Sequence, residues 1–171
     1  MDSRMMDDDD VNLEREDVLV RNLAADDLRR TVRIDAKITG RERPQMIESR
    51  MNRALGNTDI NVSLGAEIDG ALVGVVMAEV HYGDYGRAEP LAVLDTILVD
   101  PDFGGKGVGK ALIAQLLKNL RALGVDNLRT EVGWNEQPLV GFLARMGFRP
   151  AQRMVLDVAV DDAERRLSHR S

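Results

Sequence analysis

The sequence predicts an α/β fold in which a mixed central sheet of six to seven strands is flanked by about four helices. Three observations lead to this prediction: two early segments carry apolar residues at helical spacing, a middle region alternates with a period of two, and a glycine-rich loop separates a β-branched run from a long amphipathic segment. Strands and helices in this irregular order are typical of an α/β sandwich rather than a regular βαβ array.

The composition is that of an ordinary soluble globular protein, with 44% apolar and 30% charged residues among 171. No apolar run reaches the roughly 18 residues of a membrane span, and the acidic N-terminus lacks the basic region of a signal peptide, so we expect a cytoplasmic protein without a membrane partner. The absence of cysteine excludes disulfides, thiolate metal sites and cysteine nucleophiles. The two histidines, His81 and His169, lie far apart, and we expect no metal site.

The net charge of −6 comes from one segment. Residues 1–17 contain eight acidic residues and two arginines, while the remaining residues hold equal numbers of acids and bases. Such an acidic run is typical of a solvated, loosely ordered tail. The neutral remainder has no basic footprint for nucleic acid. We therefore expect a tail over 1–17, one domain over 18–162 and a polar C-terminal tail over 163–171.

The first elements are a short strand over 18–23 and two helices. Apolar residues recur at helical spacing over 28–38, and Gly40 ends that helix. Pro44 begins a second helix that continues to residue 55, since proline is well tolerated in the first turn.

A hairpin and then a strand follow. Asp69-Gly70 lies between two alternating apolar runs, which is the strongest short hairpin signal in the chain. The β-branched run 89–99 predicts the next strand. The remaining elements are expected to be a helix over 108–123, a strand over 127–134, a helix over 138–146 and a last strand or strand pair over 148–160.

The loop PDFGGKGVGKALI, residues 101–113, is rich in glycine and lysine and is compatible with two kinds of phosphate site. From Gly104 to Lys110 it matches the GxxxxGK pattern of a nucleotide P-loop. That loop requires Ser or Thr after the lysine to bind Mg²⁺, and here the residue is Ala111. A meander before the loop and only about 60 residues after it also disagree with an NTPase.

The segment ILVDPDFGGKGVGKALIAQLLKNLRALG instead resembles the acetyl-CoA motif of the GNAT superfamily of N-acetyltransferases. The order of the expected elements and the altered F/L-Y-x-x-x-G-F motif at residues 142–148 extend the resemblance over most of the chain. It implies the GNAT (acyl-CoA N-acyltransferase) fold and acetyl-CoA as cofactor. The residues it implies for the cofactor are Ile97, Leu98, Val99, Gly104, Gly105, Lys106, Gly107, Val108, Gly109, Lys110, Asn135 and Phe142.

Three departures from the family pattern limit what the resemblance implies. Gly104 replaces the usual Arg or Gln, which removes a side chain but keeps the backbone cradle. Leu143 replaces the tyrosine that often acts as general acid, and leucine cannot protonate a leaving thiolate. Asn135 lies one residue away from the family's usual asparagine. It is therefore either a contact of the pantetheine arm or an asparagine that caps a helix or forms a turn.

Amine acetylation needs a base, because an ammonium group must lose a proton before it attacks. Strict alternation in VLDTILV puts Asp95, Ile97 and Val99 on one face of the strand and Leu94, Thr96 and Leu98 on the other. A carboxylate in an apolar run indicates either a paired or a functional group, and Asp95 is the first candidate for the catalytic base. Glu79, which shares its side of the preceding strand with His81, is the second.

The acceptor side is expected between the first two helices and after the third strand. In this fold the segment TGRERP lines the acceptor pocket, so Arg41 and Arg43 are candidate substrate-binding residues, as is Tyr82. The sequence thus predicts an N-acetyltransferase that joins acetyl-CoA and a small-molecule or peptide amine in a ternary complex. The resemblance makes a homodimer possible, because dimers are common in the family, but no residue of the sequence establishes one. A non-catalytic acyl-CoA-binding or regulatory domain is the alternative.

Overall fold

The computed structural model describes residues 17–56, 60–83 and 88–169. The chain divides into two compact units, one up to Asn135 and one from Glu136 onward. The elements of the first unit are β1 (Leu19–Asn22), α1 (Leu28–Thr39), α2 (Pro44–Gly56), β2 (Leu64–Ile68), β3 (Ala71–His81), β4 (Leu91–Val99), α3 (Val108–Ala122) and β5 (Leu128–Arg129). Those of the second unit are α4 (Gln137–Arg145) and α5 (Val160–Ser168).

The sheet is mixed and has the strand order β1-β2-β3-β4-β5. The first four strands pair antiparallel in sequence order, and β5 pairs parallel to β4. The predicted α/β fold class is confirmed. The sheet in the described residues has five strands, one or two fewer than predicted.

The β2–β3 hairpin turns where the sequence predicts it. Asp69 and Gly70 have φ angles of 50° and 77°, and two positive φ angles in a two-residue loop define the turn that matches the twist of the flanking strands. This turn sets the register of β3, the strand at the centre of the sheet.

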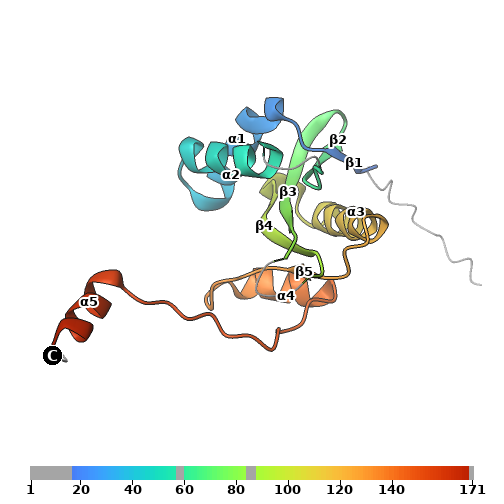
Figure 1. The fold of residues 1–171 in the computed structure, drawn as a ribbon. Helices are drawn as coiled ribbons and strands as arrows, with labels where there is room; N and C mark the ends of the chain where they lie inside the picture. The colour runs from blue at the N-terminus through green and yellow to red at the C-terminus, as the bar shows by residue number, and fades with distance from the viewer. Residues whose placement is uncertain (1–16, 57–59, 84–87, 170–171) are drawn as a thin grey trace, which may run out of the picture. The chain divides into compact units, whose positions relative to one another are not determined.

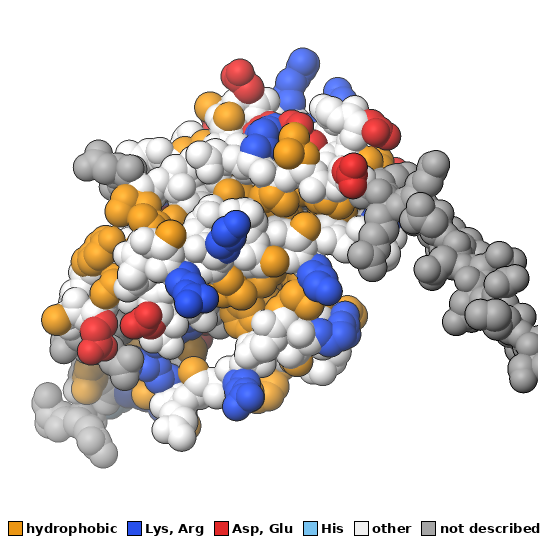
Figure 2. Space-filling model, turned by 90° about the vertical axis from the view of Figure 1, so that its right-hand side faces the viewer, with side chains coloured by type: hydrophobic (Ala, Val, Ile, Leu, Met, Phe, Trp, Pro, Cys, Tyr) orange, Lys and Arg blue, Asp and Glu red, His pale blue; other side chains and the backbone are white. Residues whose placement is uncertain are grey.

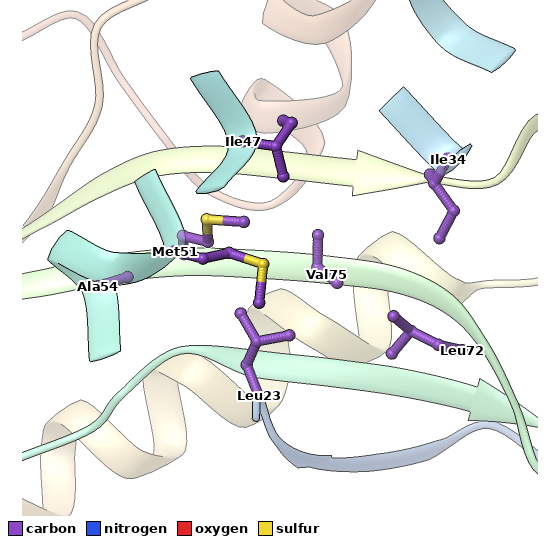
Figure 3. Packing of buried hydrophobic residues seen from close by; sticks show 8 residues of the cluster. Leu23, Ile34, Ile47, Met51, Ala54, Leu72 and Val75 are labelled. Atoms are coloured by element: carbon purple, nitrogen blue, oxygen red, sulfur yellow. The ribbon is translucent and has the colours of Figure 1, made fainter. Parts of the chain in front are cut away.

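The helices of the first unit form two layers, with α1 and α2 on one face of the sheet and α3 on the other (Figure 1). The core between α1, α2 and the sheet is shown in Figure 3, where side chains from both helices meet those of β3. Its buried members are Leu23, Ile34, Ile47, Met51, Ala54, Leu72, Val75 and Met77. This packing fixes α2 above the part of β3 and β4 that carries Glu79 and Asp95.

The second unit contains α4 and, after an extended stretch, α5. The prediction of a last strand over 148–160 was wrong: residues 148–159 form neither helix nor strand, and α5 begins at Val160. The segment has the composition of a strand, but a strand requires a hydrogen-bonded neighbour, and no described strand pairs with it.

The sequence predicts a loosely ordered acidic tail at the N-terminus and no membrane-spanning segment. The acidic tail lies outside the described residues except for Asp17. No helix within the described ranges is long and apolar enough to cross a membrane.

Candidate functional site

The glycine loop joins β4 to α3 through a short 3₁₀ turn at Pro101–Phe103. Gly105 and Gly107 follow with φ angles of 75° and 78°, a region that other residues adopt only at a cost of about 1–2 kcal/mol. A side chain at either glycine would point into open space, since no atom lies within 4 Å of the Cβ position. The loop therefore presents bare backbone on its open side.

The N-terminus of α3 opens directly from this loop. Gly107 is the N-cap and makes no side-chain capping bond, and the first intrahelical bond joins the Ala111 N–H to the Gly107 carbonyl at 2.9 Å. The N–H groups of the preceding residues in the first turn have no acceptor within the helix. Together with the helix dipole, they make this end favourable for an anion such as a pyrophosphate.

Close packing holds the start of α3 against the sheet. A Cβ atom at Gly74 on β3 would lie 2.7 Å from Val108 Cγ1 and 3.1 Å from Leu112 Cδ1. The absence of a side chain at Gly74 thus allows the first turn of α3 to approach the backbone of β3. The position of the helix N-terminus is set by this contact.

Asp100, at the end of β4, anchors the loop to α1. Its side chain is fully buried and accepts hydrogen bonds from Lys37 Nζ at 2.9 Å and from Arg30 Nη2 at 2.9 Å. It also accepts a bond from the Asp102 N–H at 3.1 Å. Burial raises the pKa of Asp100, but the hydrogen bonds from Lys37 and the Asp102 backbone and the charges of Lys37 and Arg30 outweigh it, so the pKa lies below the ordinary value.

We expect Asp100→Asn to lower the free energy of unfolding by about 2 kcal/mol, because it removes a buried charge that accepts several charge-assisted hydrogen bonds. Denaturant titration monitored by circular dichroism measures the change. Asp102→Asn is the matched control, since Asp102 also contacts Lys37 but is largely exposed, and we expect it to cost less than about 1 kcal/mol. Equal losses in the two variants would contradict the anchoring role.

The stability difference between the wild type and Asp100→Asn is expected to depend on pH. Because the pKa of Asp100 is lowered by folding from an ordinary value of 3.8, its stabilisation is present above that value and is lost as the pH falls through the folded pKa. The difference in unfolding free energy between wild type and Asp100→Asn should stay constant from pH 7 to about pH 5 and shrink below about pH 4.

A β-bulge interrupts β4 at Asp95. Thr96 pairs with Met77 and Leu94 pairs with Ala78, so Asp95 has no direct partner on β3. The predicted division of β4 into two alternating faces was therefore wrong: Asp95 and Thr96 both face α2, and the Thr96 hydroxyl donates to Asp95 Oδ2 at 2.8 Å. An extra residue in one strand shifts every later side chain to the opposite face.

The strands β4 and β5 separate just before the bulge. They pair only at Ala92–Leu128 and Val93–Arg129, and the Thr130 hydroxyl then donates to the Leu94 carbonyl at 2.9 Å. In the described part of the sheet, the stretch of β4 from Asp95 to Val99 has a strand neighbour only on its β3 side. The predicted cofactor-binding residues Ile97, Leu98 and Val99 lie on this stretch, which leads into the glycine loop.

Two arginines of α2 bind the two candidate carboxylates. Arg53 Nη2 lies 3.5 Å from Asp95 Oδ1, and Arg53 Nε lies 3.2 Å from Glu79 Oε1. Arg50 Nη1 donates to the Thr96 hydroxyl at 2.8 Å and its Nε lies 3.8 Å from Asp95 Oδ2. His81 Nε2 completes the group at 3.6 Å from Glu79 Oε2. All of these charged side chains are partly exposed, so the group is open to solvent.

Sequence reasoning found the carboxylates but missed Arg50, Arg53 and Thr96. The available signal was the spacing of the two arginines, which at i and i+3 on α2 lie on one side of the helix. Arg50 and Arg53 were not recognised because they lie next to the apolar face of α2. Thr96 was missed because no residue type in the sequence indicates the bulge that brings its side chain to the same face of β4 as Asp95.

The remaining predicted residues lie in different environments. Arg43 donates to the buried Asp35 from Nε at 2.9 Å, whereas Arg41 and Tyr82 are exposed. Lys106 Nζ lies 5.5 Å from the centre of the Phe103 ring. The other predicted loop residues, Gly104, Val108, Gly109 and Lys110, follow one another into α3. Asn135 is exposed at the end of the first unit, and Phe142 lies on α4 in the second.

Comparison with known proteins identifies what this arrangement is similar to. Residues 27–148 match the model of the acetyltransferase (GNAT) family. Among solved structures, a transcriptional regulator from Bacillus halodurans C-125 superposes with a TM-score of 0.69 at 17% identity, over 84% of this chain and 99% of that one. The aminoglycoside N-acetyltransferase AAC(6′)-Iy in complex with CoA gives 0.69 at 18% identity, over 84% and 95%. A ribosomal-protein-alanine N-acetyltransferase from Brucella melitensis biovar Abortus 2308 gives 0.66 at 20% identity, over 84% and 99%.

Proposed function

The chain belongs to the acetyltransferase (GNAT) family, and from this premise we propose that it transfers an acetyl group from acetyl-CoA to a primary amine by direct attack in a ternary complex. The observation that carries the proposal is the position of a bulged carboxylate, Asp95, on the same strand that ends in an open, glycine-lined helix N-terminus. A few residues of β4 therefore connect the proposed catalytic base to the proposed binding site for the pyrophosphate of CoA.

The loop residues fit the pyrophosphate of CoA. The open space at the Cβ positions of Gly105 and Gly107 allows phosphate oxygens to approach the backbone, and the first-turn N–H groups of α3 donate to them. Lys106 and Lys110 add positive charge. The part of β4 that β5 leaves unpaired offers backbone groups of residues 97–99 to the pantetheine arm, with Asn135 as a further contact.

Acetyl-CoA supplies a thioester whose thiolate leaves when the amine attacks. Asp95 accepts the proton of the incoming ammonium, directly or through water, and Glu79 binds the same cation from β3. Arg50 and Thr96 hold the carboxylate of Asp95 in place. A backbone N–H near Val99 polarises the thioester carbonyl. The chain has no cysteine, which favours direct transfer over a route through a thiol intermediate.

Leucine replaces the tyrosine that often acts as general acid in the family, so no phenol at that position can protonate the leaving thiolate. Leu143 on α4 is 4% exposed and has no proton to donate. The thiolate therefore leaves into solvent or takes its proton from another group. A non-catalytic acyl-CoA-binding domain is the second candidate function, and this residue is the observation that favours it.

The acceptor is proposed to be a small-molecule or peptide amine, with Arg41, Arg43 and Tyr82 on its side of the site. The similar structures include enzymes named for aminoglycosides and for a ribosomal protein, and fold alone does not choose between such acceptors. A cytoplasmic location and a homodimeric state complete the proposal.

Two measurements test the function. We expect CoA, but not Mg-ATP, to raise the melting temperature, because the loop lacks the hydroxyl that a nucleotide P-loop uses for Mg²⁺. We also expect CoA release from acetyl-CoA to depend on an added amine in a panel of aminoglycosides, polyamines, amino acids and peptides. Protection by CoA without release for any amine would favour the non-catalytic domain, and protection by Mg-ATP alone would contradict both.

A further inference from the structure

Arg53 lies across the two carboxylates that the proposed mechanism assigns to the acceptor amine. Its Nη2 is 3.5 Å from Asp95 Oδ1, and its Nε is 3.2 Å from Glu79 Oε1. An acceptor ammonium that is bound by Glu79 and gives its proton to Asp95 needs the space beside these same carboxylates. Two cations so close together repel each other, so the guanidinium of Arg53 has to move aside when the amine binds.

The contacts of Arg53 are easier to break than those of the neighbouring arginines. Its side chain is 51% exposed, and its two ion pairs are open to solvent, a class of contact that contributes little to stability. Arg50 is 35% exposed and donates from Nη1 to the Thr96 hydroxyl at 2.8 Å. Arg43 donates to the buried Asp35, and its departure would break a buried ion pair.

An exposed arginine is not in itself a sign of a binding site. Figure 2, viewed from the side on which α3 lies in Figure 1, shows separate lysines and arginines at the surface with hydrophobic side chains between them. Charged side chains in such places are solvated by water. Arg53 differs because it contacts both of the carboxylates that the proposed reaction requires.

The displaced guanidinium stays beside the site, because the backbone of α2 is held in place. Met51 and Ala54, close to Arg53 on the same helix, are buried in the core between α2 and the sheet. The side chain of Arg53 therefore moves without its helix, and its charge remains next to a bound ammonium. The acceptor either supplies an anion for this charge or leaves two neighbouring cations unbalanced.

The charges of the site favour an acceptor that carries both signs. In the free protein the guanidinium groups of Arg50 and Arg53 balance the carboxylates of Asp95 and Glu79. An amine with a carboxylate of its own adds one charge of each sign and keeps this balance. Its ammonium takes the place of the guanidinium, and its carboxylate binds Arg53. A plain amine, a polyamine or an aminoglycoside adds only positive charge.

We propose that the acceptor is a free amino acid, or a similarly compact amine with a carboxylate a few bonds from its nitrogen. Arg53 selects it by moving from Asp95 and Glu79 to the carboxylate of the acceptor. This inference rests on the proposed acetyl transfer for the roles of Asp95 and Glu79. The planar guanidinium of arginine binds a carboxylate through two parallel hydrogen bonds. The carboxylate has to lie near the amine, because Arg53 reaches it from beside the same two side chains.

Steady-state kinetics with matched acceptors measure the selection. The standard amino acids that have a primary amine are each compared with their amide and with the amine left when the carboxyl group is removed. We expect kcat/KM for the best amino acid to exceed both others by at least about tenfold, because each lacks the charge-assisted hydrogen bonds to Arg53. The amide has a more acidic ammonium than the amino acid and the plain amine a less acidic one, so differences in amine basicity cannot produce a preference against both.

Arg53→Met separates selection of the acceptor from a purely supporting role. Methionine removes the charge but keeps a flexible side chain that is favourable in a helix. We expect kcat/KM to fall by at least about tenfold for the amino acid and not to fall for the plain amine. Arg33→Met, at an exposed position of α1, is the control and should keep the wild-type preference. Equal losses for all three acceptors would mean that Arg53 only holds the carboxylates in place, and would overturn the proposal.

Calorimetry with the same amino acids and CoA-saturated protein gives a readout that does not require catalysis. We expect binding to the wild type and an affinity at least about tenfold lower in Arg53→Met. Binding that depends on Arg53, without turnover of any amine, would support the site and refute the acetyl transfer. Equal turnover of amino acids, amides and plain amines would refute the selection and leave the acetyl transfer intact. A wild type that binds no amino acid would also overturn the inference.

Discussion

Replacing Gly107 with leucine is expected to abolish CoA binding. Gly107 has a φ of 78° and begins α3, and the added side chain would project into the open space where we place the pyrophosphate. Loss of charge-assisted hydrogen bonds to the phosphates, each contributing about 1.5–3 kcal/mol, corresponds to an affinity loss of at least about 100-fold. Isothermal titration calorimetry with CoA measures it.

Gly124 provides the matched control at the other end of α3. It has a φ of 74° and equally open space at its Cβ position. Gly124→Leu therefore introduces the same backbone strain as Gly107→Leu but adds no side chain to the glycine loop before α3. We expect Gly124→Leu to lose stability but to bind CoA as the wild type does. If both variants bind CoA normally, the loop does not hold the phosphates.

Asp95→Asn is expected to reduce turnover by about 100- to 10,000-fold, the usual contribution of a general base, with CoA affinity changed by less than about twofold. The amide keeps the size of the side chain and its place beside Thr96 and Arg53, but it cannot accept the proton of the acceptor. Steady-state kinetics with the best amine from the panel and calorimetry with CoA measure the two effects separately.

Two further variants separate catalysis from general electrostatics. Glu79→Gln removes the neighbouring carboxylate, and a smaller loss than for Asp95→Asn is expected because Glu79 binds the ammonium rather than taking its proton. Asp126→Asn removes an exposed carboxylate next to β5 and should leave turnover unchanged. Full turnover in Asp95→Asn would exclude Asp95 from the mechanism.

Much of the fold was predictable because its signals are local. Gly40 ends α1 in the left-handed conformation, Pro44 begins α2, and Asp69-Gly70 forms the turn of the hairpin. Each depends on the backbone preference of one or two residues. The last strand was not predictable in the same way, because the apolar alternation of residues 154–160 shows only that the segment suits a sheet, whereas strand formation also depends on a neighbour.

The part of the site that depends on glycine conformation was predictable from the sequence. The part that depends on how strands and helices pack against one another was only partly predictable. The positive φ angles of Gly105 and Gly107 follow from the glycine pattern before a helix. The bulge at Asp95 depends on how β3 and β4 align, and no residue type marks it. Arg50 and Arg53 reach the carboxylates only because α1 and α2 pack as a layer on this face of the sheet.

The burial of Asp100 has a consequence for the thermodynamics of ligand binding. Lys37 and Arg30 hold the start of the glycine loop to α1 by contacts that need no ligand. A loop ordered in advance loses little conformational entropy when it closes around a phosphate, so more of the interaction energy remains as affinity. In Asp100→Asn the loop would have to order during binding, and calorimetry would record this as a more unfavourable entropy of CoA binding, even with every residue that faces the phosphates intact.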